Sequence, residues 1–315
     1  MHAAVVDSFD RPPAYRELPD PAPTADTVLV DVLASAVHPR VRSQAAGSHY
    51  ASTDELPLVP GIDGVGRGPD GALRYFLLPD TTLGAMAERT LVDPRRSIVL
   101  PDDVDPVRIA AAMNPAMSSW VALRRRITLP EHARVLVLGA TGSAGRMAVQ
   151  IAKHLGAAHV TAVGRDAGKL AQLPAIGADA LIDLTADPEA GLAETGRELD
   201  VVLDYLWGDP AATAMRAIVP ARADDDRLLQ WIAIGSMAGT EAPIPSAALR
   251  ATNLRIVGSG QGSVPARDFL AELPGLVTEL TAGGYDIATR AVPLRDVTAA
   301  WAEAPTTEDR LVLVP

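Results

Sequence analysis

The amino-acid sequence predicts an α/β protein in which a doubly wound parallel sheet is inserted into a β-rich domain. Three features of the pattern predict this. Residues 1–99 consist of short apolar runs separated by Pro, Gly and Asp clusters, which is typical of short strands. Between residues 133 and 258, apolar runs alternate with helical periodicity, as in a parallel sheet with helices on both faces. Residues 276–314 again contain strand-like runs, so we expect the chain to return and complete the first domain.

In the N-terminal part, the expected strands lie in residues 3–6, 28–37, 74–78 and 85–92. The cluster Gly68-Pro69-Asp70-Gly71 is typical of a hairpin turn. The periodicity becomes helical between residues 104 and 126. Because proline disfavours a helix interior, we predict two helices broken near Asn114-Pro115. We expect the run Arg124-Arg125-Arg126 to be a solvated helix end, where cations interact favourably with the helix dipole.

The functional prediction depends on the stretch that opens the central part. A β-branched and leucine run at 134–138 predicts a buried parallel strand, and helical spacing ends at Gly156. Three glycines, Gly139, Gly142 and Gly145, follow the predicted strand and open the predicted helix. A pyrophosphate site needs this order, because glycine lets the backbone approach the phosphates and the helix N-terminus presents unpaired N–H groups. The alternative is a tight turn of purely structural purpose. The predicted phosphate contacts are Gly139, Thr141, Gly142, Ser143, Ala144 and Gly145, and the later strands are expected at 159–163, 179–183, 199–205, 228–234 and 254–258.

Residues at the ends of the later strands extend this predicted site. Gly164 and Arg165 follow the second strand, where a carboxylate favours NAD. Arginine instead can pair with the 2′-phosphate of NADP by a charge-assisted hydrogen bond, with Lys169 sharing the phosphate if its segment is helical. Asp166 lies between them, and the alternative is that both bases are ordinary surface residues. NADPH is thus the predicted cofactor. Its further predicted contacts are Ile234, Gly235, Ser236, Gly258 and Ser259, which follow two later strands.

The composition excludes several classes of function. A formal net charge of −11 over 315 residues argues against nucleic acid or an anionic membrane as the main partner. The absence of cysteine rules out disulfides, thiolate nucleophiles and cysteine-ligated zinc. No apolar run approaches the roughly 18 residues of a membrane span, and the N-terminus lacks the pattern of a secretory signal. We therefore expect a cytoplasmic protein that acts on a small molecule.

Five short motifs occur in a recognisable order. They are Pro60-Gly61-Ile62-Asp63-Gly64-Val65-Gly66, Gly84-Ala85-Met86-Ala87-Glu88, Met117-Ser118-Ser119-Trp120-Val121-Ala122-Leu123, Gly177-Ala178-Asp179, and the ending Val292-Pro293-Leu294 with Arg310-Leu311-Val312-Leu313. Together they resemble the landmarks of the medium-chain dehydrogenase/reductase superfamily, specifically its zinc-free, quinone-oxidoreductase-like branch. The resemblance implies a GroES-like catalytic domain formed by residues 1–118 and completed by residues 256–315. It also implies an inserted Rossmann domain, residues 119–255, and a homodimer.

The chain departs from the superfamily at two places. Zinc-dependent relatives carry Gly-His-Glu where this chain has Gly61-Ile62-Asp63, so we predict no metal-binding residues. Quinone-reductase relatives commonly carry Asn-Pro-x-Asp where this chain has His38-Pro39-Arg40-Val41. Since both the amide and the carboxylate are lost, the substrate of a well-known relative cannot be transferred to this chain.

Three residues are candidates for positions near the substrate. Tyr50 matches a Gly-x-Tyr of related reductases, where a phenol can bond the substrate carbonyl or donate a proton; the alternative is a tyrosine that lines a loop. His38 is a second candidate for polarising the carbonyl, because imidazole can donate near neutral pH; the alternative is a structural histidine. Ser118 stands at the superfamily's threonine position, which implies contact with the nicotinamide.

The function predicted from these observations is zinc-independent hydride transfer from NADPH to a conjugated carbonyl compound, which is a quinone, an enone or an enoyl thioester. Without a metal, hydrogen-bond donors must stabilise the negative charge that develops on the carbonyl oxygen. The alternative is a catalytically silent, NADPH-binding sensor or interaction protein of the same fold. A short-chain dehydrogenase is excluded, because no tyrosine is followed four positions later by lysine.

Overall fold

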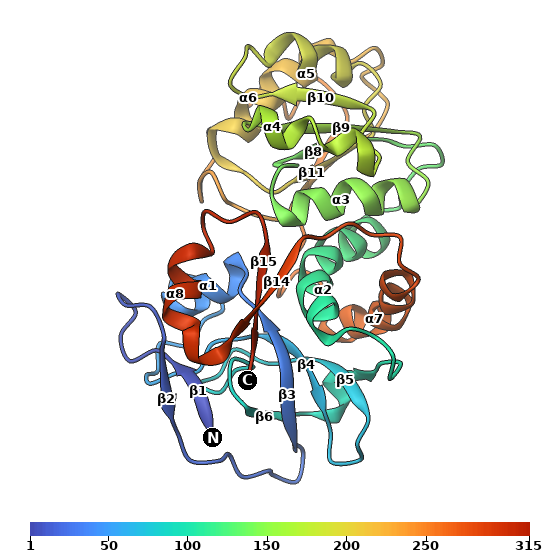
Figure 1. Cartoon of the computed structure of the whole chain (residues 1–315). Coiled ribbons are helices and arrows are strands. Elements are labelled where there is room, and N and C mark those ends of the chain that lie inside the picture. The colour runs from blue at the N-terminus through green and yellow to red at the C-terminus, as the bar shows by residue number, and fades with distance from the viewer. The chain divides into compact units, whose positions relative to one another are not determined.

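The computed structural model describes residues 1–315 and divides into two compact units (Figure 1). The first unit contains Met1–Asn114 and Leu273–Pro315, and the second contains Pro115–Glu272. The chain leaves the first unit within helix α2 (Pro106–Val121) and returns to it within helix α7 (Ala266–Thr281).

The predicted domain boundaries do not coincide with the limits of these two units. The boundary expected at 118/119 lies in α2, the helix that also contains the observed division. The boundary expected at 255/256 lies inside strand β13 (Leu254–Gly258), which is paired along its length in the sheet of the second unit. A strand contributes to its sheet as a whole, so the second unit extends past β13 and into α7.

The first unit is built on a seven-stranded sheet with the order β14-β15-β3-β4-β5-β7, in which β6 also pairs with β3. Its strands are β3 (Val28–Ala36), β4 (Asp63–Arg67), β5 (Leu73–Leu77), β6 (Arg89–Val92), β7 (Ser97–Val99), β14 (Thr289–Pro293) and β15 (Arg310–Val314). A separate antiparallel pair is formed by β1 (His2–Val5) and β2 (Ala14–Glu17). The return of the chain is confirmed, because β15 pairs with β3. The hairpin turn is confirmed too: β4 and β5 are antiparallel, and Gly71 has a φ of +77°.

Short helices cover this sheet and carry part of its core. They are α1 (Pro39–Ala45), α8 (Val297–Glu303) and the single 3₁₀ turns η1 (Pro94–Arg96) and η5 (Leu294–Asp296). Val41 of α1 and Trp301 of α8 belong to one buried cluster with Leu313 of β15. The last strand of the chain is therefore held by side chains as well as by backbone pairing.

The second unit contains a six-stranded sheet with the order β10-β9-β8-β11-β12-β13, and every pair in it is parallel. Its remaining strands are β8 (Arg134–Leu138), β9 (His159–Gly164), β10 (Ala180–Asp183), β11 (Val201–Asp204) and β12 (Leu229–Ala233). From β8 the chain builds outward to β10, and from β11 it builds outward to β13 in the opposite direction. Ligands of doubly wound sheets bind beyond the carboxyl ends of the strands at this change of direction. The predicted fold class is confirmed.

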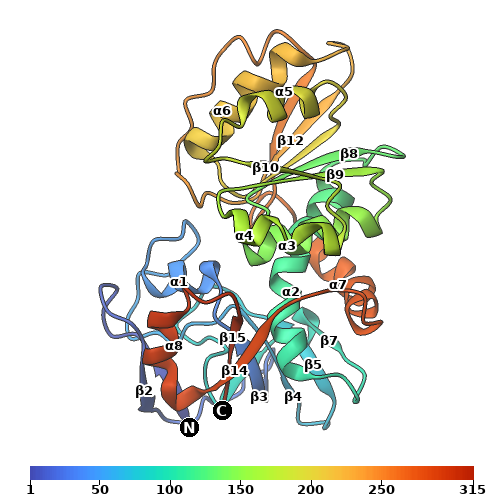
Figure 2. The same cartoon turned by 45° about the horizontal axis from the view of Figure 1, so that its top comes forward.

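Helices lie on both faces of the parallel sheet, as Figures 1 and 2 show. α3 (Ser143–His154) lies on one face, and α5 (Glu189–Gly196) and α6 (Gly208–Ile218) lie on the other. Three shorter turns complete the unit: α4 (Ala167–Leu170), η3 (Leu173–Ile176) and η4 (Val219–Ala221). The four central strands, β9, β8, β11 and β12, are buried on both sides, which explains why their sequences are almost continuously apolar.

The predicted break at Asn114-Pro115 is wrong. α2 continues through Pro115 to Val121, and the α-helix ends only where a π-helical turn begins, at Ala122–Arg126. A proline inside a helix costs about 3 kcal/mol. Here the apolar face on both sides of it, including Met113 and Ala116, is buried, so packing outweighs the missing hydrogen bond.

Candidate functional site

The glycine turn after β8 leaves the N-terminus of α3 open. Gly139 has a φ of +93°, and its N–H and that of Ala140 both donate to Val163 O over 2.9 Å, which fixes the turn against β9. Gly142 is the N-cap residue of α3, so no side chain caps the helix, and its first turn has no acidic residue. The N–H groups of this turn are therefore available to an anion.

The glycines of the turn serve different purposes. A Cβ on Gly145 would lie 2.6 Å from Ala140 Cα and closer still to Gly139 O, so Gly145 allows α3 to pack against the turn. A Cβ on Gly142 would meet nothing nearer than Gly139 O at 3.7 Å. The side of Gly142 on which a side chain would stand is thus open. An uncapped helix end beside open space fits the pyrophosphate of a dinucleotide.

The end of β9 lies against the same turn. A Cβ on Gly164 would be 2.6 Å from Thr141 Cγ2, so only glycine allows this approach. Arg165 is exposed and its guanidinium has no partner in the chain. Asp166 is already used, because its carboxylate accepts from Lys169 N over 3.0 Å as the cap of α4, and Lys169 Nζ lies 3.9 Å from it. Arg165 is therefore the base left available for a 2′-phosphate.

A buried carboxylate that we did not predict organises the turn after β11. Asp204 is fully buried, and it accepts hydrogen bonds from Leu206 N (2.9 Å), Trp207 N (2.8 Å) and Trp231 Nε1 (2.9 Å). Burial raises the pKa of Asp204, although these donors oppose the effect. Trp207 has a φ of +53°, a strained value for a residue with a side chain. The bonds to Asp204 hold this strained backbone in place.

The turns after β8, β11 and β12 lie together at the carboxyl edge of the sheet. A Cβ on Gly139 would be 3.0 Å from Leu206 Cδ2, and a Cβ on Gly235 would be 2.7 Å from Tyr205 O. Ile234 N donates to Asp204 O over 2.8 Å, and the next strand joins them through Ser259 N, which donates to Ala233 O over 2.9 Å. The structure thus brings the predicted contacts at 234–236 and 258–259 to the edge that carries the glycine turn.

Ser118 also reaches this edge. Its Oγ donates to Pro115 O over 2.7 Å and lies 3.0 Å from the hydroxyl of Tyr205, at the end of β11. Burial raises the pKa of Tyr205 to about 12, so its hydroxyl keeps its proton at neutral pH. Contact between Ser118 and the nicotinamide stays a prediction, and Tyr205 is the partner that the sequence did not indicate.

The three consecutive arginines lie at the end of the helix, where Arg124 and Arg125 are exposed as expected, but they also form hydrogen bonds that we did not predict. Arg124 Nε and Arg125 Nε each donate to the carboxylate of Glu272 over 2.6 Å, and Trp120 Nε1 donates to it over 2.8 Å. Arg126 bonds Gly258 O (2.7 Å) and Ser263 O (3.0 Å). All three arginines of this π-helical turn therefore have partners in the second unit.

We expect Glu272→Gln to destabilise the protein by about 2 kcal/mol at neutral pH, because hydrogen bonds from charged donors to a buried carboxylate are lost. Burial acts to raise the pKa of Glu272, but the hydrogen bonds from Arg124 and Trp120 and the arginine charges outweigh it and lower the pKa. The stability from the ionised group is therefore present above about pH 4.5 and lost as the pH falls through the lower folded value. Urea unfolding between pH 8 and pH 3.5 measures this.

The two proteins should differ by a constant amount above about pH 5 and converge below about pH 4. The exposed Glu55→Gln serves as the control and should match the wild type at every pH. A difference between wild type and Glu272→Gln that persists unchanged at pH 3.5 would contradict the prediction.

The structure does not support His38 as a donor to substrate. Its side chain is 1% exposed, and both ring nitrogens are used: Nε2 lies 3.0 Å from Asp63 Oδ1, and Nδ1 accepts from Val41 N at 3.4 Å as the cap of α1. Tyr75 donates to the other oxygen of Asp63 over 2.8 Å. Burial lowers the pKa of His38 despite the nearby carboxylate. We assign this network to holding α1, since all three side chains are buried.

Tyr50 lies in the loop that follows α1. The residue is 75% exposed, and its ring centroid is 4.1 Å from that of His49, at an angle of 31°. The sequence placed Tyr50 near the substrate but gave no reason to single out His49. The signal that it offered was only the sequence Gly47-Ser48-His49-Tyr50, in which two aromatic rings are adjacent.

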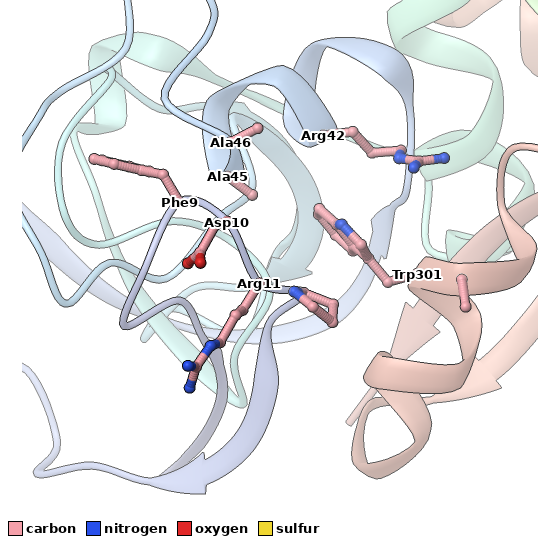
Figure 3. Close-up of a pocket in the computed structure, with 9 residues that line it drawn as sticks. Phe9, Asp10, Arg11, Arg42, Ala45, Ala46 and Trp301 are labelled. Carbon is pink, nitrogen blue, oxygen red and sulfur yellow. The ribbon is translucent and has the colours of Figure 1, made fainter.

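A pocket of about 310 Å³ lies beside this loop in the first unit (Figure 3). Its lining residues are Phe9, Asp10, Arg11, Pro12, Arg42, Ala45, Ala46, Trp301 and Ala302. Figure 3 shows Trp301 pointing toward α1, which carries Ala45. A Cβ on Gly47 would be 3.0 Å from the ring of Phe9, so Phe9 forms both the pocket wall and a support for the loop.

No group of three or more His, Cys, Asp or Glu side chains is placed to hold a metal ion. None of the helices combines the length and the apolar composition that a membrane crossing requires.

The chain is similar to known oxidoreductases. A family model described as "Zinc-binding dehydrogenase" matches residues 144–282. A probable NADPH-dependent quinone reductase from Emericella nidulans is 32% identical over 359 aligned positions, covering 100% of both chains. The 2-methylene-furan-3-one reductase of Solanum lycopersicum is 29% identical over 197 residues, covering 58% of this chain and 50% of that protein. Escherichia coli quinone oxidoreductase, solved with NADPH, has a TM-score of 0.84 at 18% identity over 100% of both chains, a likeness of fold alone.

Proposed function

The chain belongs to the medium-chain dehydrogenase/reductase superfamily, in its NADPH:quinone oxidoreductase-like branch, and from that premise we propose that it reduces a conjugated carbonyl compound with NADPH. The observation that supports the cofactor best is the N-terminus of α3, which no side chain caps and which has open space at Gly142. Arg165, which has no partner in the chain, follows the residue that packs against the same turn. The substrate class that we propose is a quinone, an enone or an enoyl thioester. Relatives named as a quinone reductase and as a furanone reductase support this class.

The residues of the chain have separate parts in this reaction. NADPH, when bound, supplies the hydride. The N–H groups at the start of α3 would hold the pyrophosphate, and Arg165 would pair with the 2′-phosphate. Charge develops on the carbonyl oxygen of the substrate, and a hydrogen-bond donor there is worth about 3–4 kcal/mol where it has been measured. We propose Tyr50 as one such donor.

We propose that the reaction needs no zinc. The chain contains no cysteine, and Ile62 stands where zinc-dependent relatives carry a ligand histidine. Hydrogen-bond donors would then stabilise the developing charge in place of a Lewis acid. Activity that survives dialysis against a strong chelator would support this, and its loss with recovery on adding zinc would overturn it.

We also propose a homodimer formed through the edge of the parallel sheet. β13 is the last strand of that sheet, so the backbone groups on its outer side have no partner strand, and its residues are half-buried or exposed. An exposed edge of this kind favours pairing with another strand. Light scattering should report about twice the chain mass of 32.9 kDa. A cytoplasmic location stays a prediction.

One experiment tests the function and the cofactor together. Oxidation of NADPH and of NADH is followed over a panel of quinones, enones and acyl thioesters, with wild type and with Arg165→Asp. We expect turnover with NADPH, and a KM for NADPH raised about 10- to 100-fold in the variant, because hydrogen bonds to a charged group contribute about 1.5–3 kcal/mol. NADH, which lacks the 2′-phosphate, should be little affected. Arg216→Asp, in the last turn of α6, is the matched control.

The outcomes separate the two functions that the fold allows. Tight NADPH binding without turnover on any member of the panel would favour the NADPH-binding sensor or interaction protein. If the protein neither binds nor oxidises NADPH, both proposed functions are wrong.

A further inference from the structure

The hydrogen bond at His49 fixes which of its ring nitrogens carries the proton. Ala51 N lies 3.1 Å from His49 Nδ1. A backbone amide can only donate, so Nδ1 is the acceptor, and in the neutral ring the proton is on Nε2. Nε2 has no hydrogen-bond partner in the chain. His49 therefore presents an N–H donor that the fold itself does not use.

The ring is also held in its neutral form. Partial burial and, to a smaller extent, the guanidinium of Arg40 lower the pKa of His49 to about 4, although Asp80 opposes them. These are the charged groups that face the ring: Arg40 from α1, and Asp80 from the segment after β5, bonded to each other and mostly buried. At neutral pH His49 is thus a hydrogen-bond donor and not an acid. A neutral imidazole can polarise a carbonyl in this way.

The contrast with His38 identifies which histidine can act on a substrate. Both histidines flank α1, but His38 is 1% exposed and uses both nitrogens inside the fold. His49 is half-buried, uses one nitrogen, and has its ring 4.1 Å from that of the exposed Tyr50. Two consecutive residues therefore bring an imidazole ring and a phenol ring into contact.

We propose that His49 Nε2–H donates a hydrogen bond to the carbonyl oxygen of the substrate, beside the hydroxyl of Tyr50. This inference rests on the proposed function. When a hydride from NADPH adds to the electron-poor carbon, its C–H bond to the cofactor breaks, leaving NADP⁺, and a new C–H bond forms on the substrate. The conjugated π electrons shift, and an electron pair moves to the carbonyl oxygen. His49 stabilises that oxyanion without giving up its proton. A proton from solvent, passed through Tyr50, then completes the reduced product.

The test compares variants of His49 in the full chain. His49→Phe removes the donor but keeps a ring against Tyr50, and we expect kcat to fall about 100-fold. His49→Gln restores an N–H near the position of Nε2 and should recover most of this loss. The Kd for NADPH, measured by fluorescence titration, should stay within twofold in both variants. His2→Gln is the matched control, because His2 also stacks on a tyrosine, Tyr15, at 4.8 Å, but lies at the start of β1.

Two further readouts distinguish a catalytic role from a structural one. 4-(Dimethylamino)cinnamaldehyde, bound with NADP⁺ so that no hydride is available, absorbs at longer wavelength when its carbonyl accepts a hydrogen bond. We expect this red shift in wild type and His49→Gln, and its reduction in His49→Phe. The pH–rate profile of wild type should also show no limb near pH 6.5, because the ring is neutral throughout.

Each outcome bears on the proposal. If wild type turns over the panel while His49→Phe keeps its kcat and its red shift, this inference is wrong and the proposed function stands. If a limb near pH 6.5 appears in wild type and disappears in His49→Gln, the histidine acts as an acid and the proposed donor role is wrong. If wild type itself shows no turnover, the proposed function has failed first.

Discussion

Gly145→Ala is expected to destabilise the parallel-sheet unit by about 3 kcal/mol. The added Cβ would lie 2.6 Å from Ala140 Cα, and closer still to Gly139 O. Both are backbone atoms of a turn that is bonded to β9, so no side chain can rotate away, and overpacking of this kind typically costs about 1–3 kcal/mol or somewhat more. Thermal and urea unfolding followed by tryptophan fluorescence measure the effect, since Trp120, Trp207 and Trp231 all belong to this unit.

Gly142→Ala is the matched control for this prediction. Its φ is −81°, which any residue adopts, and its Cβ would have no neighbour within 3.7 Å. We expect it to lose no more than about 1 kcal/mol, the cost of alanine at an N-cap, while its affinity for NADPH falls, because the methyl group occupies space beside the start of the helix. Equal destabilisation of both variants would show that the close approach of α3 is not the reason for glycine at 145.

Asp204→Ala should be comparably severe, with a loss of about 4 kcal/mol. The substitution leaves one buried donor, Trp231 Nε1, and two partly buried donors, Leu206 N and Trp207 N, without an acceptor, and a buried donor of this kind costs about 1–3 kcal/mol. It also releases the strained backbone of Trp207, so the turn that contacts Gly139 should move. Urea unfolding measures the stability, and the Kd for NADPH should rise with it.

The control for Asp204 lies three strands away in the same sheet. Asp183 ends β10 much as Asp204 ends β11, and it also accepts a hydrogen bond from a backbone amide, Thr185 N, over 2.8 Å. Its hydrogen bonds are exposed, so water can replace them, and Asp183→Ala should change stability little. A small effect of Asp204→Ala, similar to that of Asp183→Ala, would contradict the account of Asp204 as the residue that fixes the turn.

The sequence allowed accurate prediction where the cause of a structure is local. The strand at 134–138 and the glycine turn follow from residues within about twenty positions, because burial on both faces demands an apolar run and a close approach demands glycine. The return of the chain was also predictable, since the apolar run at 310–314 has the length and alternation of a strand.

Features that depend on distant residues were not predictable in this way. Glu272 is 152 positions from Trp120, and nothing in either local sequence indicates the other. From the sequence we therefore interpreted the arginine run as a solvated helix end and did not predict its bonds to Glu272. At Pro115 we predicted a break in the helix, because proline disfavours a helix interior. The helix continues there, because the residues on both sides of Pro115 pack in the core. The role of His38 was unpredictable for the same reason, since its ring bonds Asp63, which in turn bonds Tyr75, and both are distant in sequence.

The pairing of β15 with β3 has a consequence for synthesis of the protein. Ser35 and Ala36 of β3 pair with β15 (Arg310–Val314), which is synthesised long after β3, so this part of β3 has no neighbour on that side until β15 has left the ribosome. The inserted parallel-sheet unit is complete at Glu272 and can fold before β15 has been synthesised. A chain that stops before Arg310 should therefore keep a folded parallel-sheet unit while its first unit becomes prone to aggregation.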